Sequence, residues 1–146
     1  MKKINIVVIL ILVFAVGGFF VYQYVNQNVE GLESVEADYT MSCDSIYQEF
    51  KSDKGKASQK FLGKAIILSG EVNSVENAGN NVTVVYKIKS GEAIIRCALD
   101  SLNAPKLKTA QGQTLVLKGE YVGYEDDVMF VETPEINFNR CVIVTK

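Results

Sequence analysis

The side chains that could carry chemistry in this chain of 146 residues are few, because it contains no histidine and only three cysteines. Histidine titrates nearest to neutral pH, so its absence removes the usual general base, the hydrolase triad and most zinc-ligand sets. The cysteines stand at positions 43, 97 and 141, and none forms the C-x-x-C pair of redox and zinc-binding motifs. The pattern argues against catalysis by any of these routes.

Cys43 and the acidic run Glu125–Asp127 are the remaining places where reactive or metal-binding groups occur. Cys43 is predicted to begin a helix, where a thiol has a lowered pKa, but no base accompanies it and a small buried residue is the expected role. Glu125–Asp127 lacks the spacing of an EF-hand, which favours a solvated turn over a calcium site. Because the sequence also lacks an acid–base pair and a phosphate-binding loop, we expect no enzyme activity, no metal and no cofactor.

Residues 1–25 are predicted to be a transmembrane anchor. Lys2 and Lys3 precede the uncharged segment Ile4–Val25, which is as long as the roughly 20 apolar residues that cross a bilayer as a helix. A cleaved signal peptide is the alternative, but its apolar core is usually about 7–15 residues long, and no small-residue cleavage site follows here. The positive-inside rule places Lys2 and Lys3 in the cytoplasm. The rest of the chain is therefore expected outside the cytoplasm, in a periplasmic or extracellular space.

Residues 26–39 are polar and acidic and are predicted to be a juxtamembrane linker. The folded domain is expected over residues 40–146, and it should begin with helix. Ser42 is a suitable N-cap, and apolar residues recur at helical spacing from Ile46 to Phe50. One or two short helices are therefore predicted ahead of the first strand.

The segments GKAIILSGEV and GQTLVLKGEY, residues 63–72 and 112–121, are near repeats. Both alternate in polarity with the period of two that is typical of a strand. Gly70 and Gly119 are equivalent positions in them, and a strand that bends at the corner of a barrel needs a residue without a Cβ. Five short strands with turns between them predict a mainly β domain, either a small closed barrel or a sandwich. The predicted strands are residues 64–72, 81–89, 93–99, 114–124 and 141–144.

A set of positions across this domain matches a known pattern: Tyr47, Phe50, Asp53, Ala57, Phe61, Gly63-Lys64, Gly70-Glu71-Val72, Ile95-Arg96-Cys97, Gly112, Gly119 and Cys141-Val142-Ile143-Val144. Together these residues resemble the tRNA_anti-like family of small bacterial OB-fold domains, which often follow a signal or membrane anchor. The resemblance covers about residues 37–146 and implies the five-stranded OB barrel. The chain departs from the family pattern around residues 130–140, where an extra segment precedes the last strand.

An OB-fold binds its ligands on the face of its second and third strands and in the loops after its first and fourth strands. The resemblance therefore implies Tyr86, Lys87, Lys89 and Arg96 as ligand-binding candidates, with Tyr86 offering a ring for stacking. The two loops contain carboxylates and no lysine or arginine. Because phosphate binding depends on lysine and arginine, nucleic-acid binding is not favoured.

Cys97 and Cys141 fall on the third and last predicted strands, which are neighbours in an OB barrel. The resemblance thus leaves two alternatives for them, a disulfide in an oxidising compartment or two packed, reduced thiols.

These observations predict a membrane-anchored, non-enzymatic, OB-like module outside the cytoplasm, which binds a protein, peptide or glycan. The alternative is a single-stranded nucleic-acid-binding OB-fold protein, which follows from fold analogy alone.

Overall fold

The structure, a computed structural model, describes residues 16–18, 31–108, 111–126 and 133–144. The chain divides into two compact units, residues 1–30 and Gly31–Lys146, and the second unit contains all the elements described below. The predicted membrane anchor over residues 1–25 lies outside the described residues except for positions 16–18. Within the described residues, no helix is both long enough and apolar enough to span a bilayer.

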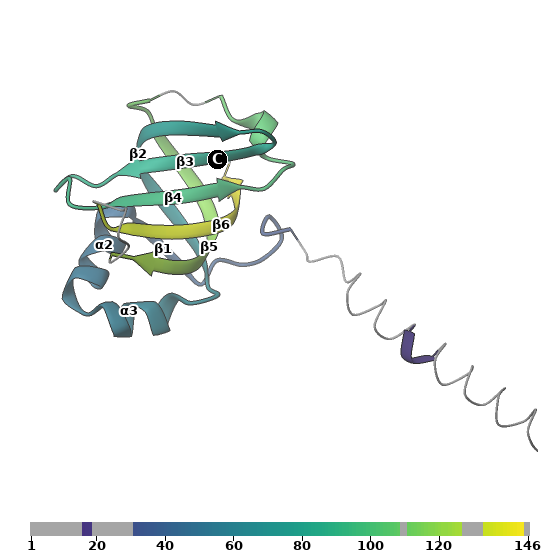
Figure 1. Cartoon of the computed structure of the whole chain (residues 1–146), viewed down its shortest axis with the longest axis horizontal. Coiled ribbons are helices and arrows are strands. Elements are labelled where there is room, and N and C mark those ends of the chain that lie inside the picture. Colours follow the sequence, from purple (N-terminus) through teal and green to yellow (C-terminus); the bar gives the residue numbers. More distant parts are fainter. Residues whose placement is uncertain (1–15, 19–30, 109–110, 127–132, 145–146) are drawn as a thin grey trace, which may run out of the picture. The chain divides into compact units, whose positions relative to one another are not determined.

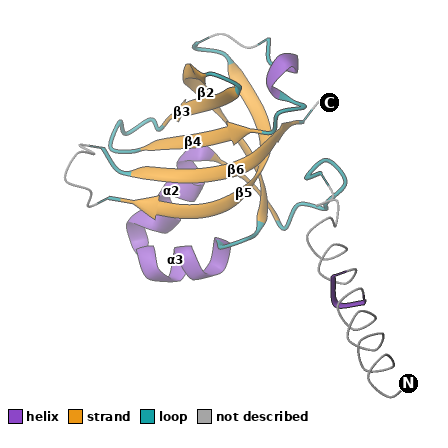
Figure 2. Ribbon diagram, turned by 45° about the vertical axis from the view of Figure 1, so that its right-hand side comes forward, coloured by secondary structure: helices purple, strands orange, loops and turns teal. Residues whose placement is uncertain are grey.

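Five strands form a closed barrel (Figures 1 and 2): β2 (Ala65–Ala78), β3 (Asn81–Lys87), β4 (Ile94–Leu99), β5 (Thr114–Glu125) and β6 (Glu135–Ile143). Neighbouring strands follow the order β2-β3-β4-β6-β5, and β5 pairs back with β2 to complete the ring of hydrogen bonds. Within the ring β4 and β6 run parallel, and the other pairs are antiparallel. The prediction of a mainly β, five-stranded barrel is confirmed for this ring.

A sixth strand, β1 (Tyr39–Ser42), joins the sheet and was not predicted. It pairs in parallel with the first half of β2, from Tyr39 opposite Ile66 to Ser42 opposite Ser69. The first half of β2 pairs with β5 along its other edge, whereas its second half pairs with β3. Therefore β1 and β3 follow one another along the same edge of β2, and the junction between them lies at Gly70.

The barrel core is built from alternate residues of the strands, as the period of two predicts. On β2, Ile66 and Leu68 are fully buried, and on β5 Leu117 and Tyr121 are buried in the same core. Each full burial of a large apolar side chain contributes roughly 1.5–3 kcal/mol. The repeated pattern in the sequence is therefore the inner face of two strands that pair with each other in the barrel.

Gly70 and Gly119 are explained by close packing as well as by their place in the strands. Neither has a positive φ angle. A Cβ added to Gly70 would lie 2.5 Å from the Sγ atom of Cys43, and a Cβ added to Gly119 would lie 2.5 Å from the Sγ atom of Cys141. Each glycine therefore leaves room for a cysteine sulfur from a neighbouring element.

Two helices, α2 (Cys43–Ser52) and α3 (Lys54–Phe61), precede the barrel and pack against its core. The predicted N-cap is confirmed, because the Ser42 hydroxyl accepts a hydrogen bond from the amide of Ser45. The helices are separated at Asp53, whose carboxylate caps α3 by accepting from the amide of Lys56. An aromatic cluster then holds the helices to β5, with the ring of Phe50 5.3 Å from that of Tyr121.

The last strand begins earlier than predicted. The sequence placed it at residues 141–144, but β6 runs from Glu135 to Ile143. Ile136 and Phe138 point into the core at alternate positions, so the segment that looked like an insertion is strand. The prediction missed it because Pro134 and two asparagines obscured the alternation.

The segment from Gly31 to Asp38 lies against the barrel and belongs to the same compact unit. Leu32 is buried with Ala65 and Val142. The ammonium group of Lys118 donates to the carbonyl oxygens of Glu33 and Val35 at 3.1 and 2.9 Å. This part of the predicted linker is thereby fixed to the folded domain.

Candidate functional site

The outer face of β3 and β4 is the surface on which an OB-fold would bind its ligand. Along β3, Val84 and Tyr86 belong to the core, so the alternation turns Val85 and Lys87 outward. On β4 the same alternation turns Arg96 outward, and Arg96 lies directly opposite Val85. Arg96 thus occupies the middle of this face.

Arg96 is held between two carboxylates, and we call Glu76, Arg96 and Glu135 the Arg96 network. Its Nη1 atom lies 2.6 Å from Oε2 of Glu76 on β2, and its Nε atom lies 3.0 Å from Oε2 of Glu135 on β6. To reach Glu76 the side chain crosses β3, where Val85 is only 2% exposed although it is outside the core cluster. The hydrogen bond to Glu76 is the main cause of a raised pKa of Arg96. The cation at the centre of the face is therefore already neutralised by its own neighbours.

Tyr86 is not on this face, which corrects the expectation that its ring could stack on a ligand. It is fully buried, and its hydroxyl donates to the carbonyl oxygen of Leu115 at 3.3 Å. Every aromatic side chain in the described residues of the compact unit belongs to the core or packs against it. The described part of the face therefore offers no ring to a base or a sugar.

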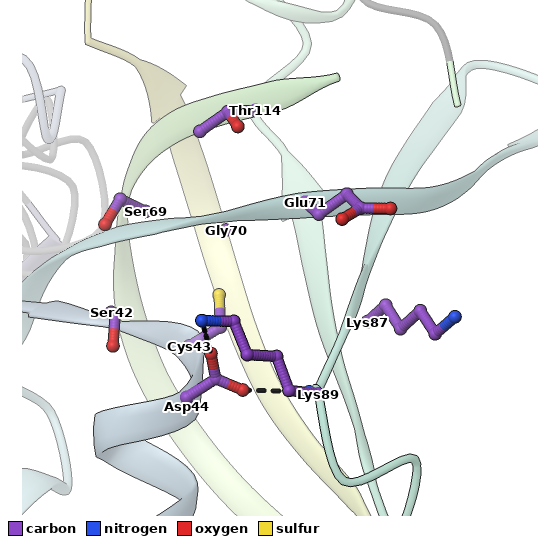
Figure 3. Close-up of a pocket in the computed structure, with 9 residues that line it drawn as sticks. All are labelled: Ser42, Cys43, Asp44, Ser69, Gly70, Glu71, Lys87, Lys89 and Thr114. Carbon is purple, nitrogen blue, oxygen red and sulfur yellow. Dashed lines mark hydrogen bonds and ion pairs between the residues drawn. The ribbon is translucent and has the colours of Figure 1, made fainter. Parts of the chain in front are cut away.

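A pocket with a volume of about 450 Å³ opens at the junction between β1 and β3 (Figure 3). We call it the corner pocket. It brings together four segments that are distant in the sequence: the start of α2, the corner of β2, the end of β3 and the start of β5. The lining residues are Ser42, Cys43, Asp44, Ser69, Gly70, Glu71, Lys87, Lys89 and Thr114. Two of the predicted ligand-binding residues, Lys87 and Lys89, therefore meet here, whereas Tyr86 and Arg96 do not line the pocket.

Charged groups surround the corner pocket. Asp44 is engaged by Lys89, whose backbone amide donates to Oδ1 at 2.9 Å and whose ammonium group lies 3.8 Å from Oδ2. Glu71 and Lys87 face each other on adjacent strands, and their side chains extend to the same side in Figure 3. Glu71 was not among the predicted site residues, because only the pairing of β2 with β3 places it beside Lys87.

Cys43 lies at the back of the pocket beside Gly70, and its chemistry differs from the prediction. The sequence suggested a lowered pKa at the start of a helix, but burial and the neighbouring carboxylate of Asp44 raise the pKa of Cys43 to about 12. Desolvation outweighs the helix dipole here. The thiol is therefore neutral at physiological pH, which fits the expected role of a small buried residue.

Cys97 and Cys141 are free, fully buried thiols in the structure. Of the two alternatives that the sequence left, the structure thus contains the reduced pair. Burial is also the main cause of the raised pKa of Cys97.

The raised pKa of Cys43 predicts a loss of stability at alkaline pH. Above its ordinary pKa of 9.0 the unfolded thiol ionises, whereas the folded thiol keeps its proton up to about pH 12. The unfolded state then binds fewer protons, so the free energy of unfolding should fall as pH rises through this window. Urea unfolding at several pH values should show a shallower fall for Cys43→Ala than for the unaltered chain. Equal slopes would contradict the assignment.

Comparisons with known proteins agree with the barrel topology. The family model described as tRNA_anti-like matches residues 1–134. No curated protein matches the chain. A Klebsiella pneumoniae protein named "putative nucleic acid-binding lipoprotein" is similar in structure with a TM-score of 0.56 and 16% identity, over 82% of this chain and 100% of the other.

Two further solved structures resemble the chain more weakly. An OBody bound to hen egg-white lysozyme has a TM-score of 0.43 and 17% identity, over 60% of this chain and 87% of the other. A "putative aspartyl-tRNA synthetase" from Leishmania major has a TM-score of 0.48 and 8% identity, over 77% of this chain and 22% of the other. At these identities structural likeness concerns the fold, and the family assignment rests on the sequence model. The chain belongs to the tRNA_anti-like family of OB-fold proteins.

Proposed function

We propose that this protein is a non-enzymatic binding module, held at the cell membrane by its N-terminal segment and exposed outside the cytoplasm, which captures a peptide or amino-acid ligand at the corner pocket. The uncharged segment Ile4–Val25 behind Lys2 and Lys3 supports the anchor and its orientation. The absence of histidine from the sequence supports a role in binding rather than catalysis.

One observation favours the corner pocket over the outer face of β3 and β4 as the binding surface. The middle of the outer face of β3 and β4 is occupied by the Arg96 network, in which one guanidinium already contacts two carboxylates. A ligand there would have to break these ion pairs and desolvate the freed groups, which costs more than filling an open pocket. The corner pocket holds two predicted binding residues, Lys87 and Lys89, and falls in the size range of about 300–1,000 Å³ that is usual for binding sites.

Site-specific photocrosslinking in membranes of cells that produce the full chain tests this proposal. A photoreactive residue at Thr114, on the corner pocket, should give a discrete crosslinked species, and Lys87→Ala in the same chain should weaken it. The matched controls are Thr83, on the outer face of β3, and the exposed Gln59 on α3. Crosslinks from Thr83 alone, or equal crosslinks from all three positions, would contradict binding at the pocket.

Single-stranded nucleic-acid binding is the second candidate, and the name of the Klebsiella pneumoniae relative favours it. The described loop between β2 and β3 holds no lysine or arginine, and the central arginine of the face is paired twice. Fluorescence anisotropy with labelled oligonucleotides, at about 50 and 200 mM salt, separates the two candidates because phosphate contacts make affinity fall with salt. Our proposal predicts no salt-sensitive binding, and binding that Arg96→Ala abolishes would establish the second candidate.

A further inference from the structure

The corner pocket is lined by two charged side chains of opposite sign, Glu71 and Lys87, that have no ion-pair partner among the described residues. Most other charged side chains in the described residues are engaged, and the lysines of the two helices all form ion pairs: Lys51 with Glu92, Lys54 with Asp126, Lys56 with Asp53 and Lys60 with Glu49. Glu71 and Lys87 make no ion pair or side-chain hydrogen bond in the part of the chain that the structure describes. Both line the corner pocket.

Glu71 and Lys87 are neighbours in the sheet, but their side chains form no ion pair with each other. Glu71 on β2 is the direct register partner of Lys87 on β3, a spacing at which opposite charges commonly form a cross-strand pair. Figure 3 shows the two side chains extending in the same direction at different heights, on the side of the pocket away from Cys43. The carboxylate of Glu71 and the ammonium group of Lys87 therefore lie at one edge of the pocket.

The rest of the lining is polar and small. Ser42, Ser69 and Thr114 contribute hydroxyls, and no aliphatic or aromatic side chain lines the pocket. A hydroxyl both donates and accepts hydrogen bonds, so it suits an amide or a carboxylate group of a ligand. Such a lining can form hydrogen bonds with a hydrophilic ligand.

We propose that the corner pocket binds an amino-acid zwitterion, with the ligand carboxylate at Lys87 and the ligand ammonium at Glu71. This inference rests on the proposed function and names the chemistry of the ligand. A zwitterion satisfies both free charges at once, and charge-assisted hydrogen bonds are about twice as strong as neutral ones. A simple anion would leave Glu71 unpaired and would also be repelled by it, and this repulsion is greater for a doubly charged phosphate.

The zwitterion could belong to a free amino acid or to a short peptide whose two ends both reach the pocket. These sources share the same chemistry and differ in the separation of the two charges. Alanine and alanyl-alanine are suitable probes for them, because their side chains are small and uncharged. N-acetylalanine keeps only the carboxylate and alanine amide keeps only the ammonium, so together they isolate each half of the interaction.

The experiment is a titration of the full chain in detergent micelles, followed by the NMR shifts of the backbone amides of Gly70 and Thr114. Alanine or alanyl-alanine should give saturable shifts with a dissociation constant at least tenfold lower than either single-charge analogue, and the tighter of the two identifies the source. Equal binding of all four, no binding, or tighter binding of inorganic phosphate would overturn the proposal.

Matched variants make the test specific. Glu71→Gln should remove the preference for alanine over N-acetylalanine, and Lys87→Gln should remove the preference for alanine over alanine amide. Lys106→Gln, a change outside the pocket, should leave the preferences of the unaltered chain in place. If Thr114 still crosslinks to a partner while no zwitterion preference appears, the ligand chemistry proposed here is wrong and the binding function stands. If neither the crosslink from Thr114 nor the preference for a zwitterion is observed, the proposed binding function is wrong as well.

Discussion

Gly70→Ala is expected to lower the free energy of unfolding by about 1–3 kcal/mol, the range of a core that is overpacked by a methyl group. The added Cβ would lie 2.5 Å from Sγ and 3.1 Å from Cβ of Cys43, and 3.0 Å from Cδ1 of Tyr86. Rotation of the thiol cannot relieve the contact with the Cβ of Cys43, so α2 has to shift. Alanine also stiffens the unfolded chain, which offsets about 0.4–1 kcal/mol of the clash. Urea unfolding of the full chain in detergent, followed by circular dichroism, measures the loss.

Two control variants distinguish crowding by the Cys43 thiol from strand curvature as the reason for glycine at position 70. Gly123→Ala, also on a barrel strand, should be close to neutral, because no atom lies within 4 Å of its added Cβ and its φ angle is not positive. Cys43→Ala in the Gly70→Ala background should recover part of the loss, with a coupling of about 1 kcal/mol or more, as expected for residues in contact. Strictly additive effects would show that curvature, rather than room for the thiol, is the reason for glycine at this position.

Phe50→Ala is expected to lower the free energy of unfolding by about 3–5 kcal/mol. Phe50 is fully buried, and its ring centroid lies 6.0 Å from Phe61, 5.3 Å from Tyr121 and 5.1 Å from Tyr124. The truncation therefore removes both its buried area and the aromatic contacts that join α2 to α3 and β5. The urea midpoint should fall in proportion, and the near-ultraviolet signal of the neighbouring tyrosines should weaken.

Gln48→Ala is the matched control, because it lies on the exposed face of the same helix. Its effect should stay within about 0.5 kcal/mol, as for other surface positions. A loss below about 1 kcal/mol for Phe50→Ala would mean that α2 is not anchored on the barrel, and the corner pocket, whose wall includes the start of α2, would then lack a fixed shape.

In our proposal, the Arg96 network and the corner pocket adapt an OB barrel to a ligand other than nucleic acid. The barrel keeps its topology, while the outer face of β3 and β4 is closed by ion pairs that join three strands. Free charges occur instead where β1, a strand outside the closed ring, meets the corner of β2. In our proposal, β1 and the start of α2 create a binding site that the five-stranded ring alone does not have.

The amino-acid sequence by itself determined the parts of this protein that depend on local periodicity. The alternation in β2, β4 and β5 identified the inward residues, because successive side chains of a strand point to opposite faces. The N-cap at Ser42 and the apolar spacing from Ile46 to Phe50 identified α2, since both signals lie within one helix. The same periodicity puts Tyr86 in phase with Val84 on the core face, and the expectation of a stacking ring overlooked this.

The remaining features depend on contacts between segments far apart in the chain, which only the tertiary structure decided. β1 is four residues long and is defined by its pairing with β2. Arg96 is neutralised by carboxylates on β2 and β6, and Glu71 becomes a candidate site residue only through its position opposite Lys87. The raised pKa of Cys43 likewise comes mainly from burial. The sequence signals that mark the start of a helix do not show whether a residue there is buried. Local patterns fix which face of an element is buried, whereas the partner of each charge and the walls of a pocket come from the packing of distant segments.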